Sequence, residues 1–286
     1  MIFLDGELSA VEQDPSTSKF RVIPMPLERT VSYGAGTAGG PRAILDASQE
    51  LERLWRGAEP CATGIATETA VPCDGPLPEV MERLANRTQF AVASGAVPVV
   101  LGGEHSLTYG AVLGVQRALE QPIGIVQIDA HADLRVAYQG ERHSHASVMH
   151  LLVSETDAVL AQYGVRALCQ AEVASRRQHR VVFCDGEDLA KGVRPSLPDD
   201  FPMNIYVSFD VDGLDPSVLP ATGTPVPGGL GFWQALHLLD DLCSGRRIVG
   251  LDVVELAPTE TSQMSDFTTA QLTYALISLA LTSQNS

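Results

Sequence analysis

Two short segments of the chain carry carboxylate and imidazole side chains at every second position. The first reads Asp-Ala-His-Ala-Asp over residues 129–133, and the second reads Asp-Val-Asp over residues 210–212. Alternate residues of an extended segment point to the same side, so each segment can direct its polar groups toward one point. A third segment, Gly-Gly-Glu-His-Ser over residues 102–106, adds another histidine. The combined set is His105, Asp129, His131, Asp133, Asp210 and Asp212.

These side chains have the chemistry of a site for divalent cations. Carboxylates and imidazoles without a thiol suit ions such as Mn²⁺, Fe²⁺, Co²⁺ or Zn²⁺. The set exceeds what one tetrahedral site requires, and it suffices for two ions that share bridging carboxylates. Two such ions about 3.5–4 Å apart can activate water and stabilise charge in a transition state. The alternative is that the aspartates only cap helices, which three such segments in one pattern argue against.

Each of the three segments follows an apolar run that is typical of a buried parallel strand. These runs cover residues 97–101, 123–128 and 204–209. Further strands are expected at 20–25, 164–168, 180–184 and 247–253, with a possible edge strand at 64–70. Helices are expected at 41–55, 78–93, 106–119, 146–162, 170–178, 230–243 and 267–283.

This alternation of strands and helices predicts an α/β fold with three layers, α/β/α, around a mostly parallel sheet of about eight strands. The carboxyl ends of parallel strands lie along one edge of such a sheet, and ligands bind just beyond that edge. The polar segments all follow strand ends, so the predicted fold brings them together.

Length and composition favour one cytoplasmic domain. The chain has 286 residues without a linker or repeat, and any cut between residues 105 and 212 would split the candidate site, so we expect a single domain over residues 1–286. The start is not basic, as a signal peptide would be, and no apolar run is long enough for a membrane helix. Five scattered cysteines indicate reduced thiols in the cytoplasm. A formal net charge of −16 disfavours nucleic acid as a partner.

The three polar segments resemble the signatures of the arginase/agmatinase (ureohydrolase) family. The similarity rests on residues 102–106, 129–133 and Ser-Phe-Asp-Val-Asp-Gly-Leu-Asp-Pro at 208–216, and it extends from about residue 20 to about residue 279. It implies an arginase-like fold and two Mn²⁺ ions per chain that serve the hydrolysis of a guanidinium group. It also implies a homo-oligomer, often a trimer or hexamer.

The resemblance further implies a role for each candidate ligand. Four residues match ligands of a single ion, with His105 and Asp133 on one ion and His131 and Asp212 on the other. Asp129 and Asp210 match the carboxylates that bridge the two ions. Many family members carry Asp where this chain has Glu104, a change that keeps the charge.

Two residues outside these segments are candidates for catalysis. His145 precedes a small residue in a polar stretch, as in the family pattern, so we expect it to act as the proton shuttle. His143 is the alternative. Glu255 follows an apolar strand and resembles a family glutamate, and a carboxylate there can form a bidentate pair with a planar guanidinium; otherwise it is a helix cap or a surface ion pair. Asp252, three residues earlier, should face the opposite side.

Two further segments make agmatinase-type chains the most similar members of the family. They are Ser-His-Ala-Ser at residues 144–147 and Asp-Phe-Thr-Thr-Ala at residues 266–270. We therefore expect a small cationic guanidino substrate, and the hydrolysis of agmatine to putrescine and urea. Arginases carry an Asn two residues after the last ligand of the first segment, where this chain has Arg135.

Several alternatives remain open from the sequence. Arg135 would disfavour a cationic substrate unless an acid neutralises it, or it could hold a carboxylate tail. The alternatives are therefore another guanidino compound, such as a guanidino acid or arginine, and formimidoylglutamate. Many agmatinase-like members also have Glu in place of Val226, which leaves the fit to the substrate tail open. A non-catalytic metal-binding paralogue would usually lose a ligand or the shuttle, and this chain keeps all of them.

Overall fold

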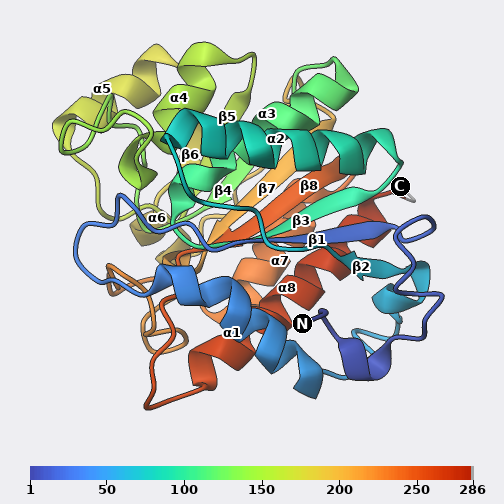
Figure 1. Cartoon of the computed structure of the whole chain (residues 1–286). Helices are drawn as coiled ribbons and strands as arrows, with labels where there is room; N and C mark the ends of the chain where they lie inside the picture. The colour runs from blue at the N-terminus through green and yellow to red at the C-terminus, as the bar shows by residue number, and fades with distance from the viewer. Residues whose placement is uncertain (285–286) are drawn as a thin grey trace.

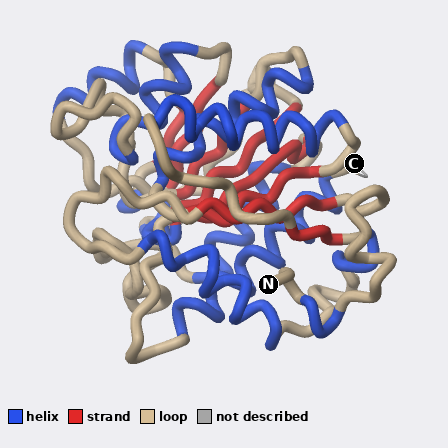
Figure 2. Tube along the Cα trace, viewed as in Figure 1, coloured by secondary structure: helices blue, strands red, loops and turns tan. Residues whose placement is uncertain are grey.

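Within residues 1–284, which the computed structural model describes, eight strands form one central sheet (Figures 1 and 2). The strands are β1 (Phe20–Met25), β2 (Ile65–Thr67), β3 (Val97–Gly102), β4 (Gly124–Ile128), β5 (Val159–Tyr163), β6 (Val182–Cys184), β7 (Asn204–Asp210) and β8 (Arg247–Val254). Their order across the sheet is β2-β1-β3-β8-β7-β4-β5-β6, and all neighbouring pairs are parallel.

Helices cover both faces of this sheet. Three lie above it in Figure 1, namely α2 (Leu77–Ala93), α3 (Thr108–Leu119) and α4 (Val148–Glu155). Three lie below it, namely α1 (Gly40–Ala47), α7 (Phe232–Cys243) and α8 (Met264–Ser283). The other two follow β5 and β6, namely α5 (Gln170–Gln178) and α6 (Gly186–Ala190). The predicted three-layer α/β architecture is confirmed.

Side chains alternate along the strands and fill a separate hydrophobic layer on each face. In β1, Phe20 and Val22 belong to the layer that α1, α7 and α8 complete, whereas Ile23 and Met25 belong to the layer beneath α2 and α3. Because both faces are covered, the strands are continuous apolar runs. That is why most of them could be located from the sequence.

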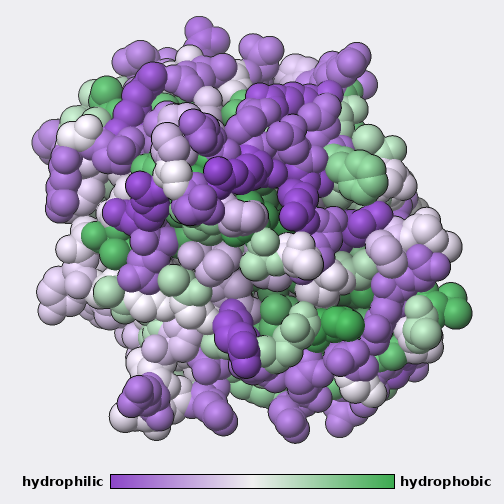
Figure 3. Space-filling view, in the orientation of Figure 1, coloured by the Kyte–Doolittle hydropathy of each residue, from purple (hydrophilic) through white to green (hydrophobic). Residues whose placement is uncertain are grey.

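The helices expose polar side chains on their outer faces. In α2, Val80 and Leu84 are buried against the sheet, while Glu79, Glu82 and Asn86 are exposed. Figure 3, drawn in the orientation of Figure 1, shows mostly hydrophilic residues over this helix. No helix within the described residues is long and apolar enough to cross a membrane.

Three predicted elements are wrong in their bounds. The helix expected at 146–162 is only α4, and its second half is strand β5. The strand expected at 164–168 lies beyond β5, because Gly164 adopts a left-handed φ of 92° at the strand end. A short apolar run fits helix and strand equally well by periodicity alone. The helix expected at 41–55 also stops early, at Ala47.

Candidate active site and metal centre

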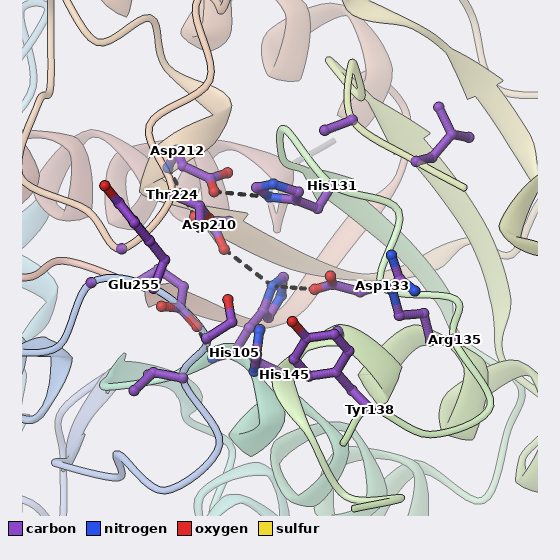
Figure 4. A pocket seen from close by; sticks show the side chains of 18 of the residues that line it. His105, His131, Asp133, Arg135, Tyr138, His145, Asp210, Asp212, Thr224 and Glu255 are labelled. Carbon is purple, nitrogen blue, oxygen red and sulfur yellow. Dashed lines mark hydrogen bonds and ion pairs between the residues drawn. The ribbon is translucent and has the colours of Figure 1, made fainter. Parts of the chain in front are cut away.

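The candidate ligands and Glu255 follow four strands that are consecutive in the sheet, β3, β8, β7 and β4. His105 begins the turn just after β3, and Glu255 follows β8. Asp210 ends β7, and residues 129–133 follow β4. Figure 4 shows side chains from all four strand ends converging at the carboxyl edge of the sheet, namely His105, His131, Asp133, Asp210, Asp212 and Glu255. The parallel arrangement therefore brings these predicted site residues together.

The backbone at these strand ends is turned rather than extended. Asp212 lies in the 3-10 turn Val211–Gly213, where its N–H donates to Oδ1 of Asp210 over 2.8 Å. After β4, the N–H of His131 donates to Oδ1 of Asp129 over 2.6 Å, and Asp133 has a left-handed φ of 51°. The expectation of a strand-like alternation is therefore wrong in detail, because short turns bring the side chains to one side.

The first group of candidate ligands surrounds Nδ1 of His105. The nearest oxygens of Asp133 and Asp129 lie 3.0 Å and 3.2 Å from this nitrogen. Oδ2 of Asp210 lies 3.3 Å from it. None of the three oxygens is aligned for a hydrogen bond, so the buried nitrogen has no hydrogen-bond partner. This arrangement suits a nitrogen lone pair directed at a cation that the carboxylates also face.

The second group is built around His131 and shares Asp129 with the first. Nδ1 of His131 lies 3.0 Å from Oδ2 of Asp212 and 3.6 Å from Oδ1 of Asp129. Donor atoms of His105, Asp129 and Asp210 form one compact group, and those of Asp129, His131 and Asp212 form the other. Asp129 thus offers one oxygen to each histidine, which is the arrangement expected of a bridging carboxylate.

The electrostatics of this cluster fit two divalent cations. Burial, and then the charge of Asp129, raise the pKa of Asp133 to about 7. Burial likewise raises the pKa values of Asp210 and Asp212. Buried carboxylates resist ionisation unless positive charge compensates them. Two divalent cations would supply that charge and would give the lone pair of His105 a partner.

A hydrogen-bonded chain behind His105 fixes the orientation of its ring. Nε2 of His105 lies 2.8 Å from Oγ of Ser208, which donates to Oδ1 of Asp252 over 2.9 Å. Asp252 also accepts hydrogen bonds from Thr108 and Tyr206. Because the Ser208 proton is used on Asp252, Nε2 carries a proton, and in the neutral ring the lone pair is then on Nδ1. Asp252 therefore faces away from the candidate centre, as predicted, and orients His105 from behind.

Replacing Ser208 with alanine is expected to weaken binding of Mn²⁺ about 10–100-fold, the range for groups that orient a metal-binding histidine. Titration of metal-stripped protein with Mn²⁺, followed by calorimetry, measures the change. Ser94→Ala, at the exposed end of α2, is the matched control and should bind as the wild type does. An unchanged affinity of Ser208→Ala would refute the orienting role.

A second chain of side chains holds the shared carboxylate. Nε2 of Gln127 donates to Oδ2 of Asp129 over 2.6 Å, and Nε2 of Gln162 donates to Oε1 of Gln127 over 2.6 Å. Arg176 in turn donates to Gln162 over 2.9 Å. Sequence reasoning missed both glutamines. The available signal was a polar residue inside each of two otherwise apolar buried strands, β4 and β5.

An open pocket of about 450 Å³ lies over the cluster (Figure 4). Its walls include Tyr33, Arg135, Tyr138, His145 and Thr224. The Arg135 guanidinium lies 5.5 Å from the ring centroid of Tyr138, in a cation–π arrangement. Val226 is not among the described residues that line the pocket. Its carbonyl instead accepts two hydrogen bonds from Arg166. The Val226 side chain therefore does not shape this pocket.

The structure separates the two candidate shuttle histidines. His145 lines the pocket, and its Nδ1 lies 3.1 Å from Oγ1 of Thr30. Burial lowers the pKa of His145, which favours the neutral ring. His143 does not line the pocket, and its ring packs edge-on against Tyr109 with centroids 5.6 Å apart. The geometry supports His145 as the shuttle.

Glu255 lies in the wall of the pocket and is buried. Its Oε1 accepts the N–H of His105 over 2.7 Å, and its own backbone has a left-handed φ of 66°. Non-glycine residues in this conformation are uncommon and cluster at functional sites. Burial raises the pKa of Glu255 to about 8, so a cationic partner in the pocket would favour its charged form.

Comparison with known proteins gives consistent matches over nearly the whole chain. Residues 18–279 match the model of the arginase family. The N(1)-aminopropylagmatine ureohydrolase of Synechocystis is 34% identical, with 96% of this chain and 94% of the relative covered. The agmatinase of Pyrococcus horikoshii is 33% identical, with 96% of each chain covered.

Solved structures give the same result. The agmatine ureohydrolase of Thermoplasma volcanium superimposes with a TM-score of 0.84 at 26% identity, over 99% of this chain and 98% of the other. The arginase of Medicago truncatula also reaches a TM-score of 0.84 at 26% identity, over 92% of this chain and 88% of the other. These two solved structures share the fold of this chain, and the names of the similar proteins differ in the substrate that they give.

Proposed function

Because this chain belongs to the arginase family, we propose that it hydrolyses the guanidinium group of agmatine to yield putrescine and urea. The chain is a ureohydrolase. The observation that carries the proposal is the pair of donor groups that share Asp129 beneath a pocket lined by His145 and Glu255. A dead paralogue would not be expected to keep this complete set.

The candidate ligands would hold two divalent cations, with Asp129 common to both. Such a pair of cations, when bound, supplies Lewis-acid activation of water and stabilises developing negative charge. Asp210 is the second carboxylate that we propose as a bridge, and the buried positions of both aspartates keep bulk water away from them. Manganese is the ion that we propose, since the donor set contains oxygen and imidazole ligands without thiolate.

Glu255 and His145 have complementary roles in this proposal. Glu255 accepts hydrogen bonds from the substrate guanidinium and places its carbon over the cluster, since a carboxylate matches the planar donor fork of a guanidinium. His145 moves the proton. In the balanced reaction a water oxygen bonds to the guanidinium carbon, the bond from that carbon to the alkyl-substituted nitrogen breaks, and the amine leaves with a proton delivered by His145.

The residues that line the pocket also limit which substrate tail it can hold. Arg135 occupies the place where arginases carry Asn, so the group that would hold the amino-acid end of arginine is missing. N(1)-aminopropylagmatine is the second candidate substrate, since the pocket is open and its volume lies in the range of roughly 300–1,000 Å³ that suits ligands larger than agmatine. The names of several relatives at about 34% identity favour the same candidate.

A comparison of kcat/KM across a substrate panel, measured by release of the amine product, tests the proposed function. The panel contains agmatine, N(1)-aminopropylagmatine, arginine, 4-guanidinobutyrate and formimidoylglutamate, each with Mn²⁺-loaded protein. Agmatine or its aminopropyl derivative should be preferred. A preference for arginine, the guanidino acid or formimidoylglutamate would overturn the proposal. The same protein, analysed by sedimentation, tests the homo-oligomer that the family membership leads us to propose.

Replacing Glu255 with glutamine is expected to lower kcat/KM for agmatine at least about tenfold. The variant keeps an Oε1 that can accept the N–H of His105, but it loses the charge and one acceptor oxygen. Charge-assisted hydrogen bonds are worth roughly 1.5–3 kcal/mol, which corresponds to about tenfold or more. Steady-state kinetics measure the loss, and metal analysis should find the ions retained. Glu187→Gln, at an exposed position, is the control, and equal kcat/KM in both variants would exclude the pairing.

A further inference from the structure

A carboxylate buried behind the cluster contacts the loop that carries Thr30. Glu104 is fully buried and accepts hydrogen bonds from the backbone N–H groups of Arg29 and Thr30. It also accepts the hydroxyl groups of Thr30, over 2.9 Å, and Ser106. Four donors therefore surround this one carboxylate, and they use the acceptor capacity of an ionised carboxyl group. Its orientation is fixed from several directions.

Thr30 connects this carboxylate to His145. Its Oγ1 lies 3.0 Å from the backbone nitrogen of His145 and 3.1 Å from the ring nitrogen Nδ1. Thr30 and His145 are 115 residues apart in the chain. The hydroxyl thus contacts three partners, namely the carboxylate of Glu104, a backbone N–H and an imidazole nitrogen.

The numbers of donors and acceptors on Thr30, Glu104 and His145 determine where the protons of this network lie. A hydroxyl group has one proton to donate and two lone pairs to accept with. Because an ionised carboxylate can only accept, the Thr30 proton is used on Glu104. Both lone pairs of Oγ1 then accept from His145, one from its backbone N–H and one from Nδ1–H. The ring proton of neutral His145 consequently lies on Nδ1, and Nε2 keeps the lone pair that takes up and releases protons.

We propose that Thr30 and Glu104 are positioning residues that fix both the orientation and the tautomer of His145. The inference rests on the proposed function, because it assigns a task to the ring that we propose as the shuttle. It also gives a physical role to Glu104, where many family members carry Asp. The longer side chain reaches the amides of residues 29 and 30, and one methylene less would shorten that reach.

Isosteric variants of Thr30 test the proposal. Thr30→Val removes the hydroxyl and keeps the shape, so kcat for the preferred substrate should fall between about 10- and 100-fold, the range for misplacement of a catalytic group by about 1 Å. KM should stay within about twofold, and metal content should not change. Thr30→Ser keeps the hydroxyl and should restore kcat to within about threefold of the wild type.

A readout independent of turnover accompanies the kinetics. In crystals of metal-loaded Thr30→Val the His145 ring should adopt a different or divided orientation, whereas in Thr30→Ser it should keep Nδ1 within hydrogen-bond distance of the hydroxyl. If Thr30→Val does not fold, Glu104→Asp replaces it, with the same expected fall in kcat. If both fold, the double variant should cost little more than either single change, because the two residues act through one contact.

The outcomes separate this inference from the proposed function. A wild-type protein that releases urea from none of the panel compounds would contradict the proposed function. An active wild type whose Thr30→Val variant keeps its kcat and the position of its His145 ring would overturn the inference alone. A Thr30→Ser variant as impaired as Thr30→Val would also overturn it, since that result would show that keeping the hydroxyl does not keep kcat.

Discussion

Replacing Asp129 with alanine is expected to remove both metal ions and to lower kcat more than about 100-fold. Asp129 is the residue common to the two donor groups, with one oxygen near His105 and the other near His131. Residues that only orient a ligand typically cost 10–100-fold in affinity or activity, so the loss of a shared ligand should exceed that range. Elemental analysis of purified, Mn²⁺-loaded protein measures the metal content, and urea release measures turnover.

Two control variants accompany Asp129→Ala. Asp188→Ala changes an exposed aspartate and should keep the full metal content and activity. Asp133→Ala removes a carboxylate that lies near His105 only, and it should lose one ion in preference to the other. Full metal occupancy in Asp129→Ala would exclude this residue as the bridge.

Replacing His145 with alanine is expected to lower kcat about 10²–10⁴-fold, the usual contribution of general acid–base groups, while the metal content is unchanged. The reason is that His145 lines the pocket but belongs to neither donor group. The loss of a general acid should lower kcat most for substrates with a poor leaving amine. Steady-state urea release from agmatine at saturating concentration measures the effect.

His143→Ala is the matched control for this prediction, because it changes a histidine two residues away that faces Tyr109 instead of the pocket. It should retain most of the wild-type kcat. A large loss in His143→Ala together with a small loss in His145→Ala would reverse the assignment. A loss of metal in His145→Ala would instead make this histidine a ligand.

The parallel sheet explains why the candidate ligands could be predicted. Residues 129–133 and 210–212 follow continuous apolar runs, and a parallel sheet directs all its strand ends to one edge. The assignment therefore needed only the strands and their direction. The order of β3, β8, β7 and β4, which no local pattern determines, then brings Glu255 beside His105.

Residues that act through long-range contacts could not be predicted from the sequence. Thr30 and Ser208 contact His145 and His105 across 115 and 103 positions of the chain. Ser208 opens the segment 208–216, but neither residue's position in the sequence indicates which histidine it contacts. Gln127 and Gln162 meet only because β4 and β5 are adjacent. Such partners depend on strand order and loop conformation, which the spacing of residue types does not encode.

Arg135 and Val226 are two positions whose effect on substrate choice the sequence alone did not determine. Both depart from common family patterns, and both left the substrate tail open. The structure distinguishes them, since Arg135 lines the pocket over Tyr138 whereas Val226 contributes its carbonyl to Arg166 outside it. Arg135 is therefore the more informative of the two positions for substrate choice.

Identification of both products formed from agmatine tests whether this chain hydrolyses the guanidinium group with bound metal. Mn²⁺-loaded wild-type protein is incubated with agmatine, and urea, ammonia and the amine product are quantified together by mass spectrometry and a urease-coupled assay. We expect urea and putrescine in equal amounts, with a loss of both when the metal is chelated. Release of ammonia in place of urea, or no turnover of agmatine with metal bound, would contradict it.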